Sequence, residues 1–186
     1  MTTGLLAVQA LARPGPEANL LANGTFDAVQ GGSVYRWMFP PSPLKACGAD
    51  AAQVERGVDK DATGNAVLFI ATTKPMKAHV WWQQEVAAEG GATYTLSVRM
   101  AAAVREADGE RNYASPDIGI YFLDANGHWL GFERVPPPCD FSPEWKTVSM
   151  KVTAPDNAAK IGVRLGIDVS AETKARFDDA VLTVAP

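Results

Sequence analysis

The sequence predicts an all-β fold, a β-sandwich of two antiparallel sheets. Short segments alternate apolar and polar residues, which is the pattern of a strand with one face on a core. Turn-forming residues separate these segments, and the 186-residue chain holds 16 Gly and 13 Pro. Apolar residues make up 47% of the chain and charged residues 20%, so the composition is that of a globular protein.

Four segments carry the alternation most clearly. The positions expected to face the core are Tyr94, Leu96, Val98 and Met100; Ile118, Ile120 and Phe122; Val148, Met150 and Val152; and Ile161, Val163, Leu165 and Ile167. A shift of one residue would turn each set outward, so the phase of a strand also decides which side chains face solvent.

Turn residues stand between these segments at Gly90-Gly91, at Asp124 to Gly127 and at Ala154 to Asn157. Asn and Gly tolerate the positive φ angles of tight hairpin turns. Only residues 101–110 have helical character, and the alternative for them is a strand end that runs into a charged loop.

The length fits one domain, which we place at residues 17–186. Residues 1–16 lie outside it. Leu5 to Ala12 is apolar and ends in small residues, like a signal-peptide cleavage region, but Met1 to Gly4 supplies no basic residue. A signal remnant and a disordered tail therefore remain alternatives.

The two cysteines, Cys47 and Cys139, both lie in Pro-rich sequence with no histidine beside them. One disulfide in an exported protein and two buried thiols are both open, and a metal site is not indicated. The formal charge of −4 argues against nucleic acid as a partner, because nucleic-acid binders carry a basic surface. No apolar run approaches the ~20 residues that span a bilayer, so no membrane is expected.

The stretch Asn19-Leu20-Leu21-Ala22-Asn23-Gly24-Thr25-Phe26-Asp27 resembles the opening strand of the jelly-roll carbohydrate-binding modules appended to xylanases and glucanases, of the family 4, 9 and 22 type. Residues 84–97, 145–155 and 177–182 resemble three further landmarks in the same order. The resemblance implies a jelly roll and a secreted, non-catalytic module that binds a polysaccharide or oligosaccharide. A catalytic domain in the same parent protein is a further expected partner.

The same resemblance implies a structural calcium ion between the first and last strands. The positions that match its acidic ligands are Asp27 and Asp178, and the carbonyl of Gly64 is expected to complete the shell. Alternation places Asp178 inward with Ala180, where a hard cation would relieve the cost of a buried carboxylate. The alternative is that both carboxylates accept backbone N–H bonds or lie in solvent.

Outward-facing aromatic and planar polar side chains form the predicted sugar site. Sugar rings have apolar C–H faces edged by hydroxyls, so their sites combine aromatic platforms with a few polar groups. Trp82 and Trp145 are expected in the core. The residues predicted to bind sugar on the concave sheet are Trp81, Gln83, Arg99, Tyr121, Trp129, Arg164 and Trp37. Arginine forks there would also suit the carboxylate of an acidic sugar.

Enzymatic interpretations have less support. His79 and His128 are isolated, and the motifs of serine hydrolases and zinc proteases are missing. Two facing carboxylates can hydrolyse a glycosidic bond, and a lyase would use Tyr121 with His79 or Arg99. The acidic candidates are Glu85, Asp117, Asp124 and Glu133. A small hydrolase or lyase and a structural or adhesion domain are therefore the alternatives to a sugar-binding module.

Overall fold

The computed structural model describes residues 18–41, 53–74, 78–104, 116–135, 143–168 and 172–185. These ranges contain strands and no α-helix, so the all-β prediction is confirmed. None of the described residues belongs to a helix long and apolar enough to cross a membrane. The predicted tail at residues 1–16 and both cysteines, Cys47 and Cys139, lie outside the described ranges.

The strands follow the sequence order of the predicted alternation. They are β1 (Val29–Gln30), β2 (Ser33–Val34), β3 (Val54–Lys60), β4 (Ala66–Thr72), β5 (His79–Ala87), β6 (Thr93–Val104), β7 (Pro116–Leu123), β8 (Trp129–Val135), β9 (Lys146–Thr153), β10 (Lys160–Asp168) and β11 (Thr173–Val184). All four segments predicted as strands are strands. Residues 101–104, given helical character above, continue β6, which is the alternative stated for them.

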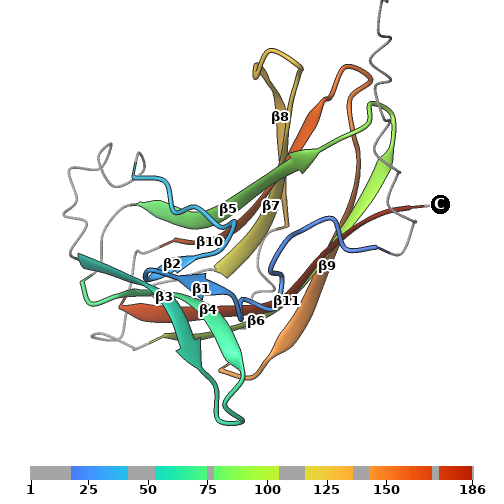
Figure 1. Cartoon of the computed structure of the whole chain (residues 1–186). Helices are drawn as coiled ribbons and strands as arrows, with labels where there is room; N and C mark the ends of the chain where they lie inside the picture. The colour runs from blue at the N-terminus through green and yellow to red at the C-terminus, as the bar shows by residue number, and fades with distance from the viewer. Residues whose placement is uncertain are drawn as a thin grey trace, which may run out of the picture.

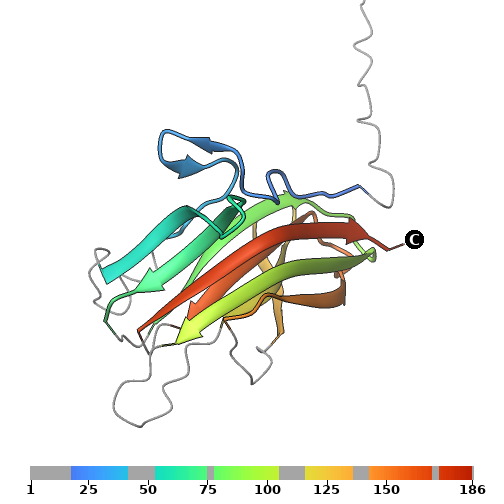
Figure 2. The same cartoon turned by 90° about the horizontal axis from the view of Figure 1, so that it is seen from below.

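The strands form two large antiparallel sheets and a small hairpin of β1 and β2. One sheet has the order β5-β10-β7-β8, and the other has the order β3-β4-β11-β6-β9. Figure 1 shows the four-stranded sheet above the five-stranded one. Figure 2 looks onto the five-stranded sheet, with the β1–β2 hairpin at its upper edge. The molecule is therefore a sandwich in which each sheet keeps one outward face.

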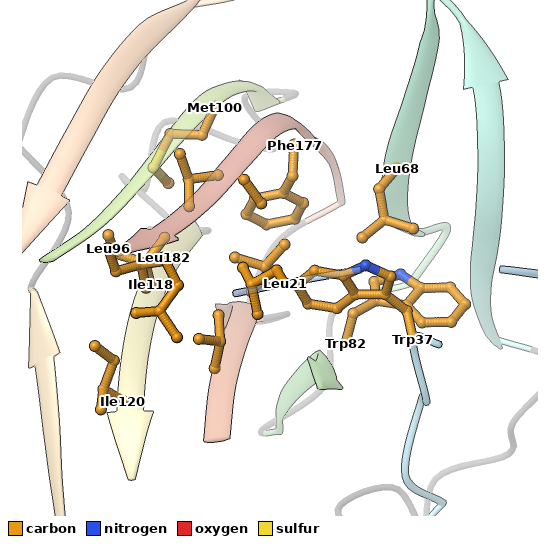
Figure 3. Packing of buried hydrophobic residues seen from close by; sticks show 14 of the residues in the cluster. Leu21, Trp37, Leu68, Trp82, Leu96, Met100, Ile118, Ile120, Phe177 and Leu182 are labelled. Carbon is orange, nitrogen blue, oxygen red and sulfur yellow. The ribbon is translucent and has the colours of Figure 1, made fainter. Parts of the chain in front are cut away.

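The core lies between the sheets and uses the predicted inward positions of both (Figure 3). Leu96, Ile118 and Leu165 are fully buried, and Trp82 is 6% exposed. The Nε1 of Trp82 donates a hydrogen bond to the carbonyl of Phe69 at 3.1 Å, which satisfies its polar atom. The core prediction for Trp82 is confirmed. Trp145 is only half-buried, so the core prediction for Trp145 is wrong.

The segment at residues 19–27, predicted to be the opening strand, is irregular. It nevertheless lies along β11, where the side-chain oxygen of Asn19 accepts the backbone N–H of Leu182 at 2.9 Å. The Gln84 amide holds the backbone N–H and C=O of Ala22 at 2.7 and 2.9 Å. The side-chain amides of Asn19 and Gln84 thus take the place of the backbone hydrogen bonds that a regular strand would make here. A Cβ at Gly24 would come within 2.1 Å of the Ala180 carbonyl, so this approach requires glycine.

Candidate functional site

The outward side of the four-stranded sheet carries a group of aromatic and polar side chains from all four strands. We call it the aromatic face and define it by Trp81, Gln83, Tyr121, Trp129, Phe132 and Arg164. Register explains the grouping: on β10, Arg164 lies between Gln83 of β5 and Gly119 of β7. Residues opposite one another in a ladder share a face, so three neighbouring strands and β8 place their side chains together.

Arg164 is the centre of the aromatic face. Its guanidinium carbon lies 4.3 Å from the ring centroid of Trp81 and 4.7 Å from that of Tyr121. Trp129 and Phe132 contribute two further rings, each at 5.3 Å. These distances are within cation–π range, so four rings attract one cation. Burial lowers the pKa of Arg164, while the arginine pKa starts so high that the group stays charged at neutral pH.

Tyr121 and Trp129 form a layered stack on this face. Tyr121 points outward as predicted, yet it is only 2% exposed because Trp129 covers it, with centroids 5.0 Å apart and an interplanar angle of 10°. Burial raises the pKa of the Tyr121 hydroxyl, which donates to Oε1 of Glu85 at 2.7 Å. Trp129 is 52% exposed. Of the two predicted platforms, Trp129 is therefore the one a ligand meets first, and Tyr121 supports it.

Trp81 forms the opposite side of the aromatic face on β5. Its Nε1 donates to Oε1 of Gln83 at 2.8 Å, and its ring stacks on His79 with centroids 5.5 Å apart. Both contacts fix the orientation of the indole, and Trp81 as a whole is half-buried. The strand phase that places Trp81 and Gln83 outward and Gln84 inward is confirmed.

Glycines make room for these rings. A Cβ at Gly162 would lie 2.1 Å from the Tyr121 ring, and one at Gly119 would lie 2.6 Å from Phe132. At Gly166 the nearest atoms would belong to His79, at 2.7 Å. Both flanks of Arg164 on the outward side of β10 are thus glycines, at positions 162 and 166. The sequence therefore has glycine, arginine and glycine at alternate positions of one strand. Sequence reasoning missed this pattern, which indicates that aromatic rings from neighbouring strands lie against the glycines.

One end of the aromatic face is charged. The Asp117 side chain is fully buried, and its Oδ2 lies 2.7 Å from Nε2 of His79 and 2.8 Å from a guanidinium nitrogen of Arg134. Arg134 also reaches Asp168 at 3.3 Å. Oδ1 of Asp117 has no hydrogen-bond partner among the described residues. This network braces the strand ends beneath Trp81, and sequence reasoning missed Arg134 and Phe132 as members of the site.

Two predicted sugar-binding residues lie elsewhere. Arg99 faces outward on β6, which belongs to the five-stranded sheet, so its placement on the concave sheet is wrong. It pairs with Asp179 at 2.9 Å and lies 5.0 Å from the ring of Trp145. Trp37 is 5% exposed and packs on Phe26 in the core with centroids 5.4 Å apart. Alternation alone gave the face of each strand but not the sheet to which that strand belongs.

A separate hollow of about 700 Å³ lies between the β1–β2 hairpin and strands β3, β4 and β5. Trp37 and Trp82 line it from the core side. At its rim the guanidinium of Arg56 lies 4.5 Å from the ring centroid of Phe39. The hollow gives Trp37 its remaining access to the surface, on a different side from the aromatic face.

The predicted calcium ligands differ in their surroundings. Asp178 is fully buried, but it pairs with Arg99 across the ladder and lies just before a bulge, so it is on the outward side of the sheet and not with Ala180. Its Oδ2 accepts from Asn65 at 2.8 Å and lies 3.5 Å from Arg99.

Asp27 is exposed, and Gly64 belongs to the turn that precedes Asn65. The described residues contain no cluster of three or more His, Cys, Asp or Glu side chains suited to a metal. Burial still raises the pKa of Asp178, as it does for a carboxylate whose charge is incompletely compensated. Calcium binding by Asp27, Asp178 and Gly64 stays a prediction.

No family model and no curated protein matches the sequence. Solved structures do match. The enzymatically active domain of bacteriophage CBA120 tailspike protein 4 aligns over 90% of this chain and 21% of its own, with a TM-score of 0.63 and 14% identity. An arabinose-bound α-L-arabinofuranosidase of family 51 aligns over 91% of this chain and 27% of its own, with a TM-score of 0.60 and 14% identity.

Isolated carbohydrate-binding modules align over nearly their whole length. A family 61 module, solved in complex with β-1,4-galactotriose, has a TM-score of 0.57 and 16% identity, and the alignment covers 90% of this chain and 99% of that one. Modules of families 4, 16 and 22 also match. The chain spans about a fifth to a quarter of the two enzymes. The predicted jelly-roll fold of carbohydrate-binding modules is confirmed.

Proposed function

We propose that this chain is a non-catalytic carbohydrate-binding module and that its aromatic face binds a polysaccharide or an oligosaccharide. The observation that supports this most strongly is the arrangement of Trp81 and Trp129 on the two edge strands, β5 and β8, with Arg164 between them. Two indoles separated by polar groups suit consecutive sugar rings, whose apolar faces stack and whose hydroxyls hydrogen-bond.

The polar groups of the aromatic face are held ready for hydroxyls. Gln83 accepts the Trp81 indole N–H through its Oε1, so its NH₂ group is the part of the amide left to donate. Arg164 adds N–H donors at the centre. Because His79, Gln83 and Tyr121 fix the neighbouring rings through direct contacts, little side-chain entropy is lost when a ligand binds.

The backbone spacing of Glu85 and Asp117, two of the acidic candidates, does not match a hydrolytic pair. Glu85 lies opposite Gly162 and Asp117 opposite Gly166, four positions along β10. At ~3.3 Å per residue their backbones are about 13 Å apart along the strand direction alone, whereas a hydrolytic pair is separated by ~5–10 Å.

The rest of the proposal concerns context. The two enzymes reported above contain this fold within a longer chain. We therefore propose that the module holds a catalytic domain of a parent protein near its polysaccharide, in a secreted or extracellular setting.

The test is a glycan array followed by calorimetry on the glycan that binds best. Trp129→Ala and Trp81→Ala should each weaken binding about tenfold or more, because a lost aromatic platform removes ~1–3 kcal/mol of contact. Trp145→Ala, on the other sheet, is the matched control and should bind normally. Absence of glycan binding, or affinity that survives both face substitutions, contradicts the proposal. A reducing-end assay on the bound glycan tests the hydrolase alternative.

A further inference from the structure

No described carboxylate lies within ion-pair distance of the cation at the centre of the aromatic face, and Asp117 and Glu85 attract it only from further away. Lys160 lies 3.9 Å from Glu85. Arg134 pairs with two carboxylates, as described above, at 2.8 and 3.3 Å. Arg164, at the centre, makes no ion pair with any residue in the described ranges. The unpaired charge therefore lies where a ligand on this face would be bound.

The surroundings of Arg164 leave one of its donors unsatisfied. Its Nε is buried and has no hydrogen-bond partner among the described residues. A guanidinium has five N–H donors, and the rings of Trp81, Tyr121, Trp129 and Phe132 attract its charge without offering oxygen acceptors. Desolvation without an acceptor is costly, and an anion that enters between the rings would recover that cost.

We propose that the glycan bound on the aromatic face is acidic, and that Arg164 selects it by gripping the carboxylate of a uronate residue. This rests on the proposed function. A planar carboxylate matches the planar guanidinium fork with two parallel hydrogen bonds. Four rings within 5.3 Å of the cation restrict the space around it, which favours a flat carboxylate over a tetrahedral sulfate ester.

The selection acts at short range. The formal charges on and around the aromatic face cancel, because Glu85, Asp117 and Asp168 on the same side of the sheet balance Arg134, Lys160 and Arg164, and the whole chain carries −4. A polyanion is therefore not drawn in from a distance, and Arg164 contributes after contact. The effect should appear in the dissociation rate and the affinity for a uronate, with a modest dependence on salt.

The experiment compares each acidic oligosaccharide with its own carboxyl-reduced form, which differs only in the carboxylate. Tetrasaccharides of galacturonate, of mannuronate and of glucuronate-substituted xylan serve as probes, and a sulfated galactan oligosaccharide tests the other anion. The unaltered full chain should bind at least one uronate probe at least tenfold more tightly than its reduced form and more tightly than the sulfated probe.

Three variants then test whether Arg164 is the residue that distinguishes the acidic glycan from its reduced form. Arg164→Met should bring the acidic and reduced forms to equal affinity, and Arg164→Lys, which keeps the charge but loses the fork, should give an intermediate ratio. Arg99→Met, an arginine on the other sheet, should leave the ratio unchanged. The wild-type ratio needs no variant, so it tests the inference even if Arg164→Met fails to fold.

The outcomes separate this inference from the proposed function. If neutral and carboxyl-reduced glycans bind as tightly as the uronates, the role proposed for Arg164 is wrong. The proposed function as a sugar-binding module still stands in that case. If the sulfated probe binds more tightly than the uronate probes, the proposal that Arg164 selects a carboxylate is wrong. If Arg164→Met still prefers the uronate over its reduced form, another residue is responsible for that preference, and the role proposed for Arg164 is contradicted. If no glycan of any kind binds, the proposed function and this inference both fail.

Discussion

The outward faces of the two sheets follow the same alternation and yet differ in character. On the five-stranded sheet the outward side chains of β6 and β9 are short and polar, and they pair with one another, as Ser97 with Ser149 and Thr93 with Thr153, each at 3.0 Å. On the four-stranded sheet the outward side chains are rings laid flat over glycines. Each face has a central arginine. Arg99 is paired with Asp179, whereas Arg164 makes no ion pair with a described residue and is surrounded by rings.

This difference separates a solvated face from a binding face. A solvated face satisfies its own hydrogen bonds and charges, so nothing is gained when a ligand covers it. A binding face keeps an apolar platform exposed and a polar donor unmatched, both of which cost stability that a ligand can restore. An unpaired arginine among aromatics is therefore stronger evidence for a ligand than an arginine on a strand.

The largest expected effect tests the strand phase on which the comparison depends. Trp82→Ala removes a core indole and should lower the free energy of unfolding by ~3–5 kcal/mol. Trp81→Ala, its neighbour on the outward side, should lower it by about 1 kcal/mol through lost ring contacts. Urea denaturation measures both. Equal losses would mean that the two side chains are not on opposite faces of β5.

One small substitution on each face sharpens the contrast between them. Gly162→Ala drives a Cβ into the Tyr121 ring and should cost ~1–3 kcal/mol of stability and weaken glycan binding, because the stack under Trp129 is displaced. Ser97→Ala on the solvated face should change stability by at most ~0.5 kcal/mol. In Tyr121→Ala the ring is gone, so adding Gly162→Ala should cost little. If the stability losses of Gly162→Ala and Tyr121→Ala simply add in the double variant, the added Cβ does not collide with the Tyr121 ring.

Removal of the paired arginine is the next effect in size. Arg99→Met should lower stability by roughly 1–2 kcal/mol, because the partly exposed pair with Asp179 contributes little, while the buried carboxylate of Asp178 loses a positive charge at 3.5 Å. Glycan affinity should not change. Thermal denaturation and calorimetry on the same preparations measure the two quantities. A loss of glycan affinity in Arg99→Met would show that the five-stranded sheet also contributes to binding.

Calcium is the smallest expected effect. A native-state ligand stabilises by mass action, but Arg99 and Asn65 already contact Asp178. Returning calcium to EDTA-treated protein should therefore raise the melting temperature by only ~2–4 °C, about 1 kcal/mol in a chain of this size. Asp178→Asn should abolish the increase. An unchanged melting temperature in the wild type would contradict calcium binding and would mean that residues of the chain alone compensate the Asp178 carboxylate.

Alternation in the sequence was enough to identify the faces of the strands. Trp81, Tyr121 and Arg164 point outward as predicted because the side-chain period of a strand is fixed by its backbone. Alternation carries no information about which strands become neighbours, so Arg99 was placed on the wrong sheet. It also fails where the period breaks, as at the bulge that follows Asp178. The burial of Tyr121 depends on Trp129, a contact between strands that only folding brings together.

The backbone contact between Met38 and Gln83 has a consequence for self-association. β5 is an edge strand, and its mid-strand N–H and C=O groups at Gln83 bond to the C=O and N–H of Met38 at 2.8 and 2.9 Å. An edge capped in this way cannot template the strand of another molecule at that point. Proline at position 38 would remove one of these two bonds and expose the edge beside Trp81. Such a variant should aggregate during concentration or storage even where its glycan affinity is intact.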